Sequence, residues 1–323
     1  MNKTIVVVGA GISGLLLAHD LQARGADVLV LEKSRGVGGR LATKRVGPAV
    51  FDQGAQFITV RDARFATVVD GWRNQELVVA WPGGAGDRII GAAGMTTMPK
   101  ALAAGLDIQR EHRVTRAVRH VNDCWEIEIE NQGMIRAERL VLTAPVPQSL
   151  ALLETGVLPS TLAESLARLT YHPCLALLCT LDGPSALPSG GIAPAGGAIR
   201  WIADNTRKGI SRGTPAALTV HTTPVFAAEH YARGVNEVTT LLAEELVPWL
   251  GGAGIVSSTL HRWKFSEPCA THPEPYVWLP ELALGFCGDA FGGPRVEGAA
   301  LSGLELASCI AASLKAEAPG EAF

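Results

Sequence analysis

Residues 9–14 form a complete G-x-G-x-x-G motif, and an uninterrupted run of β-branched residues at 4–8 stands directly before it. A run of this kind predicts a parallel strand covered on both faces. The first glycine permits a tight turn, the second lets a pyrophosphate approach the backbone, and the third lets the next helix sit close to the strand. Strand, motif and helix in this order predict a nucleotide-binding βαβ unit.

An acidic residue completes this unit. A helix that is apolar on one side follows the motif and ends at Gly25, a second strand is expected at 26–31, and Glu32 stands at its end. A carboxylate in this position can accept both hydroxyl groups of a ribose. The residues expected to hold the adenosine and pyrophosphate of a dinucleotide are Gly9, Gly11, Ile12, Ser13, Gly14, Glu32 and Lys33.

Further motifs favour FAD over NAD. A second glycine cluster leads to Gly39 and Arg40, and it offers backbone N–H donors that a simple dehydrogenase does not need. Arg40 adds a fixed cation that is expected to contact the FAD phosphates. The segment 51–57 puts small and amide residues where a flat ring can pass close to the backbone. Near the C-terminus, Asp289 follows a short apolar strand and can bind a ribityl hydroxyl, or else cap a turn. Val296 opens a helix whose positive end can face the flavin pyrimidine.

Composition bounds the remaining choices. The chain has 323 residues, a net charge of -3 and six cysteines that form no C-x-x-C pair. We therefore expect two domains, reduced thiols, no metal site and no nucleic-acid partner. No run of eighteen apolar residues occurs, so we expect a cytoplasmic protein without a membrane span.

The middle of the chain is expected to form a substrate domain. Strands are predicted at 78–81, 174–181, 198–203 and 216–221, and helices at 159–169 and 236–250. The expected fold class is α/β, with a Rossmann-like FAD-binding domain and a second, mixed-sheet α+β substrate domain. The FAD-binding domain is assigned to 1–60, 105–148 and 281–323, and the substrate domain to 61–104 and 149–280.

Taken together, the G-x-G-x-x-G, the G-G-R at 38–40 and the G-D at 288–289 resemble the flavin amine-oxidase superfamily, whose members share an amine-oxidase/p-hydroxybenzoate-hydroxylase-like fold. Within it, the chain is similar to the renalase-like enzymes. The segments that carry this second resemblance are 51–59, 94–97, 112–115, 142–147, 199–201, 204–205, 221–223 and 263–264. One departure is Lys264, which stands where some relatives carry arginine.

The resemblance implies an FAD-dependent oxidase that transfers hydride from the 2-dihydro and 6-dihydro isomers of NAD(P)H to flavin and then to O2, giving NAD(P)+ and hydrogen peroxide. It implies that Val114 meets the adenine through its backbone and that Gln56 and Phe57 border the isoalloxazine. It leaves the preference for NAD or NADP and the oligomeric state open.

Hydride transfer to flavin N5 needs no nucleophile and no metal, only a donor carbon held close to N5. The catalytic role is therefore assigned to the flavin, with Lys264 as the one candidate near N5. FAD is expected to be non-covalently held, because no cysteine or histidine lies in an evident attachment motif. The residues expected to contact the substrate are Phe57, Arg61, Thr97, Trp201, Asn205, His221 and Lys264.

Each of these residues also has a plainer interpretation. Phe57 and Trp201 fit core packing as well as stacking on a nicotinamide, Asn205 fits a turn, Arg61 a solvated surface, and Lys264 a pair with Glu267.

The whole chain has rival interpretations too. They are an amine oxidase, a flavin-binding protein without turnover, and a carotenoid-type desaturase. The first would offer an aromatic pair facing the flavin, and the three tyrosines at 171, 231 and 276 suggest no such pair.

Overall fold

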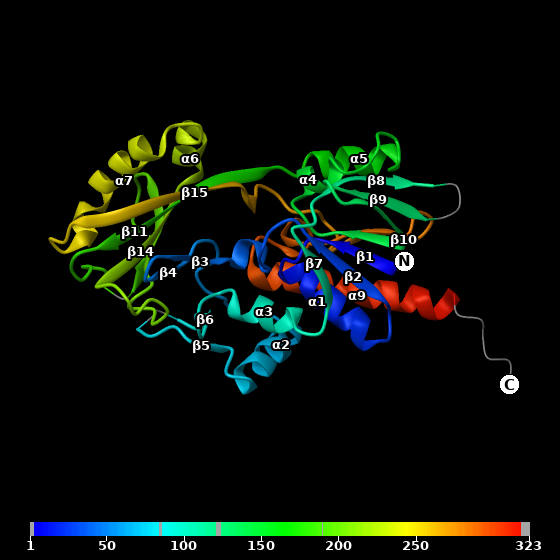
Figure 1. Ribbon diagram of the computed structural model, residues 1–323, viewed down its shortest axis with the longest axis horizontal. Coiled ribbons are helices and arrows are strands. Elements are labelled where there is room, and N and C mark those ends of the chain that lie inside the picture. The colour runs from blue at the N-terminus through cyan, green and yellow to red at the C-terminus, as the bar shows by residue number, and fades with distance from the viewer. Residues whose placement is uncertain (1–2, 84–85, 121–123, 189, 318–323) are drawn as a thin grey trace. The chain divides into compact units, whose positions relative to one another are not determined.

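The computed structural model describes residues 3–83, 86–120, 124–188 and 190–317. The chain divides into two compact units (Figure 1). Unit 1 comprises Met1–Gly39, Pro99–Thr170 and Pro268–Phe323, and unit 2 comprises Arg40–Met98 and Tyr171–Glu267.

Unit 1 is built on an eight-stranded sheet whose main path runs β16-β17-β10-β1-β2-β7. Pairing is parallel from β17 to β7, and β16, β8 and β9 join by antiparallel pairs. The strands are β1 (Lys3–Val8), β2 (Val28–Glu32), β7 (Asp107–Arg110), β8 (Val114–Arg119), β9 (Trp125–Ile129), β10 (Gly133–Leu142), β16 (Val277–Leu279) and β17 (Leu284–Phe286). The apolar run at 4–8 thus forms a central strand, as its lack of alternation predicts.

Two helices of unit 1 pack on each other, α1 (Ile12–Ala23) and α9 (Val296–Glu317) (Figure 1). A Cβ on Gly303 would lie 2.3 Å from the Ser13 carbonyl oxygen, so glycine is required for this close contact. Within the described residues, α9 alone has the length and apolar composition to cross a bilayer, but many of its side chains are buried against the protein, as in a core helix. Shorter helices are α3 (Thr97–Ala103), α4 (Val146–Leu150), α5 (Ser160–Ala167) and α8 (Asp289–Gly292).

Unit 2 contains a five-stranded sheet in the order β12-β13-β14-β11-β15. Its strands are β11 (Tyr171–Leu181), β12 (Gly191–Ile192), β13 (Ile199–Asp204), β14 (Ala216–Thr222) and β15 (Ile255–Pro268). Helix α6 (Pro224–His230) buries Ala227 in the core of this sheet, and helix α7 (Val235–Leu250) buries Val238, Leu242 and Leu246 there. The remaining elements are β3 (Thr43–Val46), β4 (Ala49–Asp52), α2 (Ala63–Asn74), β5 (Val78–Ala80), β6 (Ile89–Gly91) and the single turn η1 (Gly39–Leu41).

The predicted fold class is confirmed, but the structure draws the division of the chain differently. Residues 40–60, expected in the FAD-binding domain, group with unit 2 because Phe51 of β4 packs with Leu178 and Ala217 of the unit 2 sheet. Residues 99–104 and 149–170, expected in the substrate domain, group with unit 1, as does 268–280. For that last segment the reason is that β16 pairs with β17. The segment between β11 and β13 contains the short strand β12, which was not predicted.

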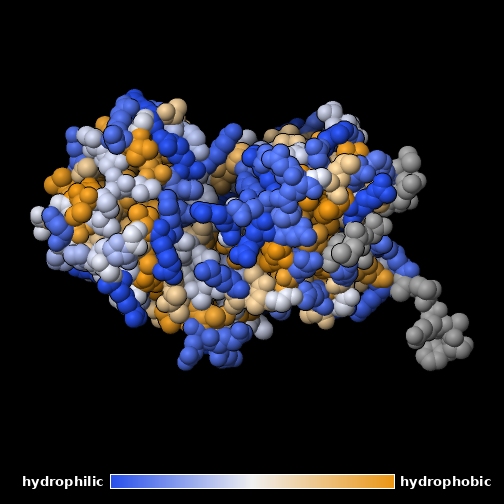
Figure 2. Space-filling view, in the orientation of Figure 1, coloured by the Kyte–Doolittle hydropathy of each residue, from blue (hydrophilic) through white to orange (hydrophobic). Residues whose placement is uncertain are grey.

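On the face shown in Figure 2, hydrophobic and hydrophilic residues are interspersed. The large hydrophobic side chains that are exposed include Val225 on α6, Val247 on α7 and Val256 on β15.

Candidate active site

The glycine motif of unit 1 divides into two positions that pack and one that stays open. A Cβ on Gly9 would lie 2.6 Å from the Thr143 Oγ1, and one on Gly14 would lie 2.2 Å from the Gly9 carbonyl oxygen. Around Gly11, by contrast, the described residues other than its chain neighbours place no atom within 4 Å of such a Cβ. Gly11 is also the N-cap of α1 and provides no side-chain acceptor for the first amides. These features fit a pyrophosphate at the N-terminus of α1.

Glu32 is held rigidly beside this loop. Its Oε2 accepts a hydrogen bond from the Ala10 amide at 2.9 Å, and its Oε1 accepts one from the Ser34 amide at 2.8 Å. Only 6% of the residue is exposed. Each carboxylate oxygen keeps a second lone pair, so the position still suits the two hydroxyls of a ribose.

The second glycine cluster lies against the first. The Gly38 amide donates to the Ala10 carbonyl at 2.7 Å, and a Cβ on Gly39 would lie 3.7 Å from the Gly11 Cα. Nearby in sequence, the Lys33 Nζ donates to Gln148 Oε1 at 3.2 Å. The two clusters predicted separately from the sequence therefore form one cradle of backbone amides.

The carboxyl ends of the parallel strands converge on this cradle. Thr143 follows β10 and donates to the Val8 carbonyl, and a Cβ on Gly288 after β17 would lie 3.7 Å from the Thr143 carbonyl oxygen. Asp289, which is 7% exposed, comes next and begins α8. This edge is where open α/β sheets bind ligands. The other predicted cofactor residues of unit 1 occupy element ends, Ser13 in the first turn of α1, Val114 at the start of β8 and Val296 at the start of α9.

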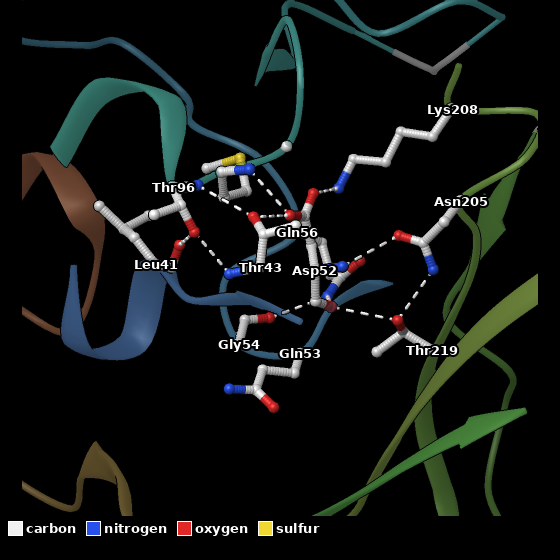
Figure 3. A network of polar contacts seen from close by, with 12 residues as sticks. Leu41, Thr43, Asp52, Gln53, Gly54, Gln56, Thr96, Asn205, Lys208 and Thr219 are labelled. Atoms are coloured by element: carbon white, nitrogen blue, oxygen red, sulfur yellow. Dashed lines mark hydrogen bonds and ion pairs between the residues drawn. The ribbon is translucent and has the colours of Figure 1, made fainter. Parts of the chain in front are cut away.

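Unit 2 contains a buried polar network around Asp52 at the end of β4 (Figure 3). The Asp52 Oδ2 lies 2.5 Å from the Lys208 Nζ, and both side chains are fully buried. Its Oδ1 accepts from the Thr43 Oγ1 at 2.6 Å and from the Met95 amide at 2.8 Å. Burial lowers the pKa of Lys208, and the Asp52 carboxylate opposes that shift. The sequence reasoning missed this network.

Asn205 belongs to the same network, which corrects its predicted substrate role. Its Nδ2 donates to the Ala217 carbonyl and the Thr219 Oγ1, and its Oδ1 accepts from the Asp52 amide at 3.2 Å. The residue is fully buried. With its amide engaged on three sides, Asn205 holds β4 against β14 and cannot also orient a substrate carboxamide.

The Asp52 network leads into the segment Gln53–Phe57, predicted to border the flavin ring. The Gln56 Nε2 donates to the carbonyls of Asp52 and Gly54, while its Oε1 is buried without a hydrogen-bond partner in the described residues. A Cβ on Gly54 would lie 2.1 Å from the Arg40 carbonyl oxygen, so glycine is required at this position for a close backbone contact. The contact of Gln56 and Phe57 with the flavin ring stays a prediction.

His221 contacts the same segment. Its Nε2 lies 3.1 Å from the Gln53 carbonyl oxygen, which also accepts from the Trp263 Nε1 at 3.0 Å. A carbonyl only accepts, so the Nε2 carries the proton. Burial lowers the pKa of His221 to about 4, with the charges of Lys208 and Arg200 adding to the shift. His221 is therefore a neutral imidazole at physiological pH.

Three aromatic side chains of unit 2, Phe57, Trp81 and Trp201, form what we call the aromatic cluster. Ring centroids are 5.8 Å apart for Phe57 and Trp81, 5.6 Å for Phe57 and Trp201, and 6.1 Å for the two indoles. A Cβ on Gly191 would lie 2.8 Å from Trp201, so the indoles pack only over glycine. Both indole Nε1 atoms are buried, and in the part of the chain that the structure describes they have no acceptor. Trp81 was not predicted.

Arg61, Thr97 and Lys264 are the remaining residues predicted to contact the substrate. Arg61 is exposed before α2, and the Thr97 Oγ1 at the start of α3 donates to the Gly94 carbonyl at 2.7 Å. Lys264 is exposed on β15, 5.5 Å from the centroid of Phe265. Glu267 pairs with Arg200, so the alternative pair with Lys264 is not formed.

Arg40 lies in η1. Its Nη1 donates to the Ser266 carbonyl at 3.2 Å, and its guanidinium lies 5.9 Å from the Tyr171 centroid. Its contact with a phosphate stays a prediction. Within the described ranges, no group of three His, Cys, Asp or Glu side chains is placed to hold a metal.

Two family models match the chain. An NAD(P)-binding Rossmann-like domain matches residues 7–70. The second model, flavin containing amine oxidoreductase, matches residues 77–311, which is more than half of the chain.

Curated relatives match over shorter segments. Protoporphyrinogen oxidase 2 of Arabidopsis thaliana is 37% identical over 69 residues, covering 21% of this chain and 14% of that protein. Putrescine oxidase of Kocuria rosea is 40% identical over 70 residues, covering 22% of this chain and 15% of that protein. The chain therefore matches only a small part of the length of either relative.

Among solved structures, cyclohexylamine oxidase from Brevibacterium oxydans is similar with a TM-score of 0.72 and 14% identity, over 98% of this chain and all of that one. A putrescine oxidase bound to putrescine has a TM-score of 0.70 at 14% identity, over 97% of this chain and 99% of that one. At this identity the likeness shows the fold. Together with the open Gly11 cradle and the buried Glu32, the family match identifies the chain as a member of the flavin containing amine oxidoreductase family, with FAD as its cofactor.

Proposed function

We propose that the protein oxidises the 2-dihydro and 6-dihydro isomers of NAD(P)H. The observation that supports this substrate class best is the pair of buried indole N–H groups in the aromatic cluster. An indole only donates, and a buried donor without a partner costs about 1–3 kcal/mol. A flat ring that carries an acceptor, such as a dihydronicotinamide with its carboxamide oxygen, can lie beside the cluster and engage these donors.

The proposed reaction asks the protein mainly for binding and orientation. The isomer loses a hydride from a ring carbon and becomes the pyridinium of NAD(P)+, and O2 takes up that hydride and one proton to give hydrogen peroxide. FAD supplies the two-electron acceptor through which this oxidation runs. The protein must hold the ring in a fixed plane and keep water away from it. The Asp52 network fixes the position of Phe57, because it holds the segment that carries this residue.

The neutral state of His221 is consistent with this chemistry. A dihydropyridine gives up hydride without first losing a proton, whereas an ammonium substrate must be deprotonated before oxidation. The His221 Nε2–H is engaged with the Gln53 carbonyl. The proposed substrates thus need no base in unit 2.

Amine oxidation is the second candidate, and the family description together with the amine oxidases of the same fold favours it. We expected an aromatic pair for such an enzyme. Tyr171 instead lies edge-on against Phe265, with ring centroids 5.7 Å apart. No ring contact between two tyrosines occurs among the described residues.

Anaerobic mixing separates the two candidates. The oxidised holoenzyme is mixed in a stopped-flow instrument with a dihydropyridine isomer, and in parallel with putrescine and with cyclohexylamine. We expect the flavin absorbance to bleach with the isomers only, and to return with stoichiometric peroxide when O2 is admitted. Bleaching by an amine but not by the isomers would replace the first candidate with the second. Background peroxide with every reductant would indicate a flavin-binding protein without turnover.

A further inference from the structure

Arg88 places a guanidinium over all three rings of the aromatic cluster. Its Cζ lies 4.7 Å from the centroid of Phe57, 5.0 Å from that of Trp201 and 6.0 Å from that of Trp81. The residue is half-buried and immediately precedes β6. Its carbonyl accepts from the Trp81 amide at 2.9 Å, which ties it to one of the rings that it covers. The chain thus supplies its own cation to the cluster.

A second cation reaches the cluster from the polar network. The Lys208 Nζ lies 5.0 Å from the Trp81 centroid while it pairs with Asp52. Aromatic faces attract cations through the ring quadrupole, and guanidinium groups stack on them especially well. In this cluster two fixed cations already use that attraction. A third cation would lose the aromatic faces and meet positive charge at short range.

The hydrogen-bonding groups of the aromatic cluster also disfavour a cationic ligand. The two buried indole N–H groups need acceptors, and an ammonium or quaternary ammonium ion has none to offer. A flat ring with an acceptor oxygen, attached to a negatively charged phosphate, satisfies the indole donors and approaches the Arg88 charge favourably.

From these contacts we propose that Arg88 determines specificity by filling the aromatic cluster with the protein's own cation. Arg88 excludes organic cations, including amine substrates, and favours flat ligands that carry acceptors and negative charge. The identity of the favoured ligand as a nicotinamide dinucleotide rests on the proposed function. Exclusion of cations follows from the geometry of this chain.

The test measures binding to the oxidised holoenzyme, so that it does not depend on turnover. Two probes are titrated by equilibrium dialysis and by tryptophan fluorescence. They are benzyltrimethylammonium, a flat organic cation, and 1,4,5,6-tetrahydro-NAD, a dinucleotide with a neutral ring and a carboxamide. The variants are Arg88→Ala and Arg88→Lys. Arg73→Ala, which also removes one arginine from unit 2, is the matched control. Arg73 is exposed on α2, where it pairs with Asp70 rather than with the aromatic cluster.

We expect Arg88→Ala to tighten binding of the organic cation by about tenfold or more and to weaken binding of the dinucleotide by a similar factor. Arg88→Lys keeps the charge, so it still excludes the cation, but it loses part of the dinucleotide affinity because it cannot stack as a plane. Arg73→Ala leaves both dissociation constants within about twofold. Flavin content and thermal unfolding confirm that each variant is folded.

The proposal is overturned if Arg88→Ala changes neither dissociation constant, or only one of them, because one cation is invoked for both effects. It is also overturned if the wild-type protein binds benzyltrimethylammonium as tightly as Arg88→Ala does. These outcomes are separable from failure of the proposed function. If both constants shift but dihydropyridine isomers never bleach the flavin, the role of Arg88 stands and the substrate assignment falls.

Discussion

Asp52 and Lys208 form an ion pair in which the Oδ2 and Nζ atoms lie 2.5 Å apart and neither side chain is exposed (Figure 3). The second carboxylate oxygen accepts from Thr43 and Met95, so the charge of Asp52 is well satisfied. Lys208 has a carboxylate on one side and the Trp81 ring on another. The pair joins the end of β4 to the turn that follows β13, and it therefore links the segment Gln53–Phe57 to the aromatic cluster.

Removing both partners of this pair should be less damaging than the sum of the two single removals. Lys208→Met leaves a buried carboxylate without its cation, and we expect it to lower the free energy of unfolding by about 3–5 kcal/mol. The double variant Asp52→Asn with Lys208→Met should lose clearly less than the sum of the single losses. Urea unfolding followed by circular dichroism measures this, with the exposed Arg73→Met as control. Additive losses would show that the two charges are not coupled.

The cradle of unit 1 was predictable from the sequence, and the Asp52 network was not, for a physical reason. Gly9, Gly14 and Glu32 act through strand, turn and helix that follow one another along the chain, so their spacing defines their geometry. Asp52 and Lys208 are separated by 156 residues, and they meet only because β4 packs on β14. The direction of a side chain across such a contact has no signature in spacing.

For Asn205, the residue type alone predicted a role that the tertiary packing does not support. Its residue type suited a carboxamide ligand, yet the tertiary contact between β4 and β14 turns its amide inward. Arg88 lies close to Trp81 in sequence, but its other two rings come from 57 and 201. Only Phe57 and Trp201 of this cluster were predicted, because aromatic residues near a redox ring are expected to stack, while an arginine before a short strand is ordinarily solvated.

Two glycine variants separate folding from cofactor binding. Gly14→Ala places a Cβ 2.2 Å from a backbone oxygen, so we expect loss of folded protein or a large drop in the unfolding midpoint. The Cβ of Gly11→Ala meets no atom of the described residues within 4 Å apart from its chain neighbours, and Gly11 has an ordinary φ of -77°, so the apoprotein should fold normally. Its methyl group would instead occupy space next to the pyrophosphate and weaken FAD binding.

Circular dichroism and flavin occupancy after dialysis read the two effects. If the Gly11→Ala protein kept full flavin occupancy at limiting FAD, the pyrophosphate would not lie at this position. A normally folded Gly14→Ala protein would show that α1 can move away from β1 without penalty.

Glu32→Gln should weaken FAD without unfolding the protein. A glutamine side chain can accept one of the two amide bonds that now hold the carboxylate, but it loses the charge and one acceptor for the ribose. A charge-assisted hydrogen bond contributes about 1.5–3 kcal/mol, so the dissociation constant of FAD should rise by roughly ten- to a hundredfold. Fluorescence titration of apoprotein with FAD measures it. Glu138→Gln, an exposed change beside Arg139, is the control.

Acid precipitation should release the flavin into the supernatant. The thiolate is the reactive form of cysteine, and burial raises the pKa of Cys174 to about 11 and those of Cys179 and Cys287 to about 12. These three side chains are therefore poor nucleophiles toward the isoalloxazine. Yellow colour that stays with the precipitated polypeptide would contradict non-covalent binding, and peptide mapping would then identify the attached residue.

Acidification should destabilise the protein in part through His221. Its pKa is lowered to about 4 in the folded chain, chiefly by burial, against about 6.5 in an unfolded chain. The unfolded state therefore binds the proton more readily between these values. The stability contributed by neutral His221 is complete above pH 6.5 and is lost as the pH falls toward 4, by at most about 3 kcal/mol.

His221→Gln keeps an N–H donor for the Gln53 carbonyl but does not titrate. Urea midpoints at pH 7 and pH 4.5 should therefore differ less in this variant than in the wild type, with His19→Gln, an exposed change on α1, as control. An equal acid-induced drop in all three proteins would assign the pH dependence to other groups.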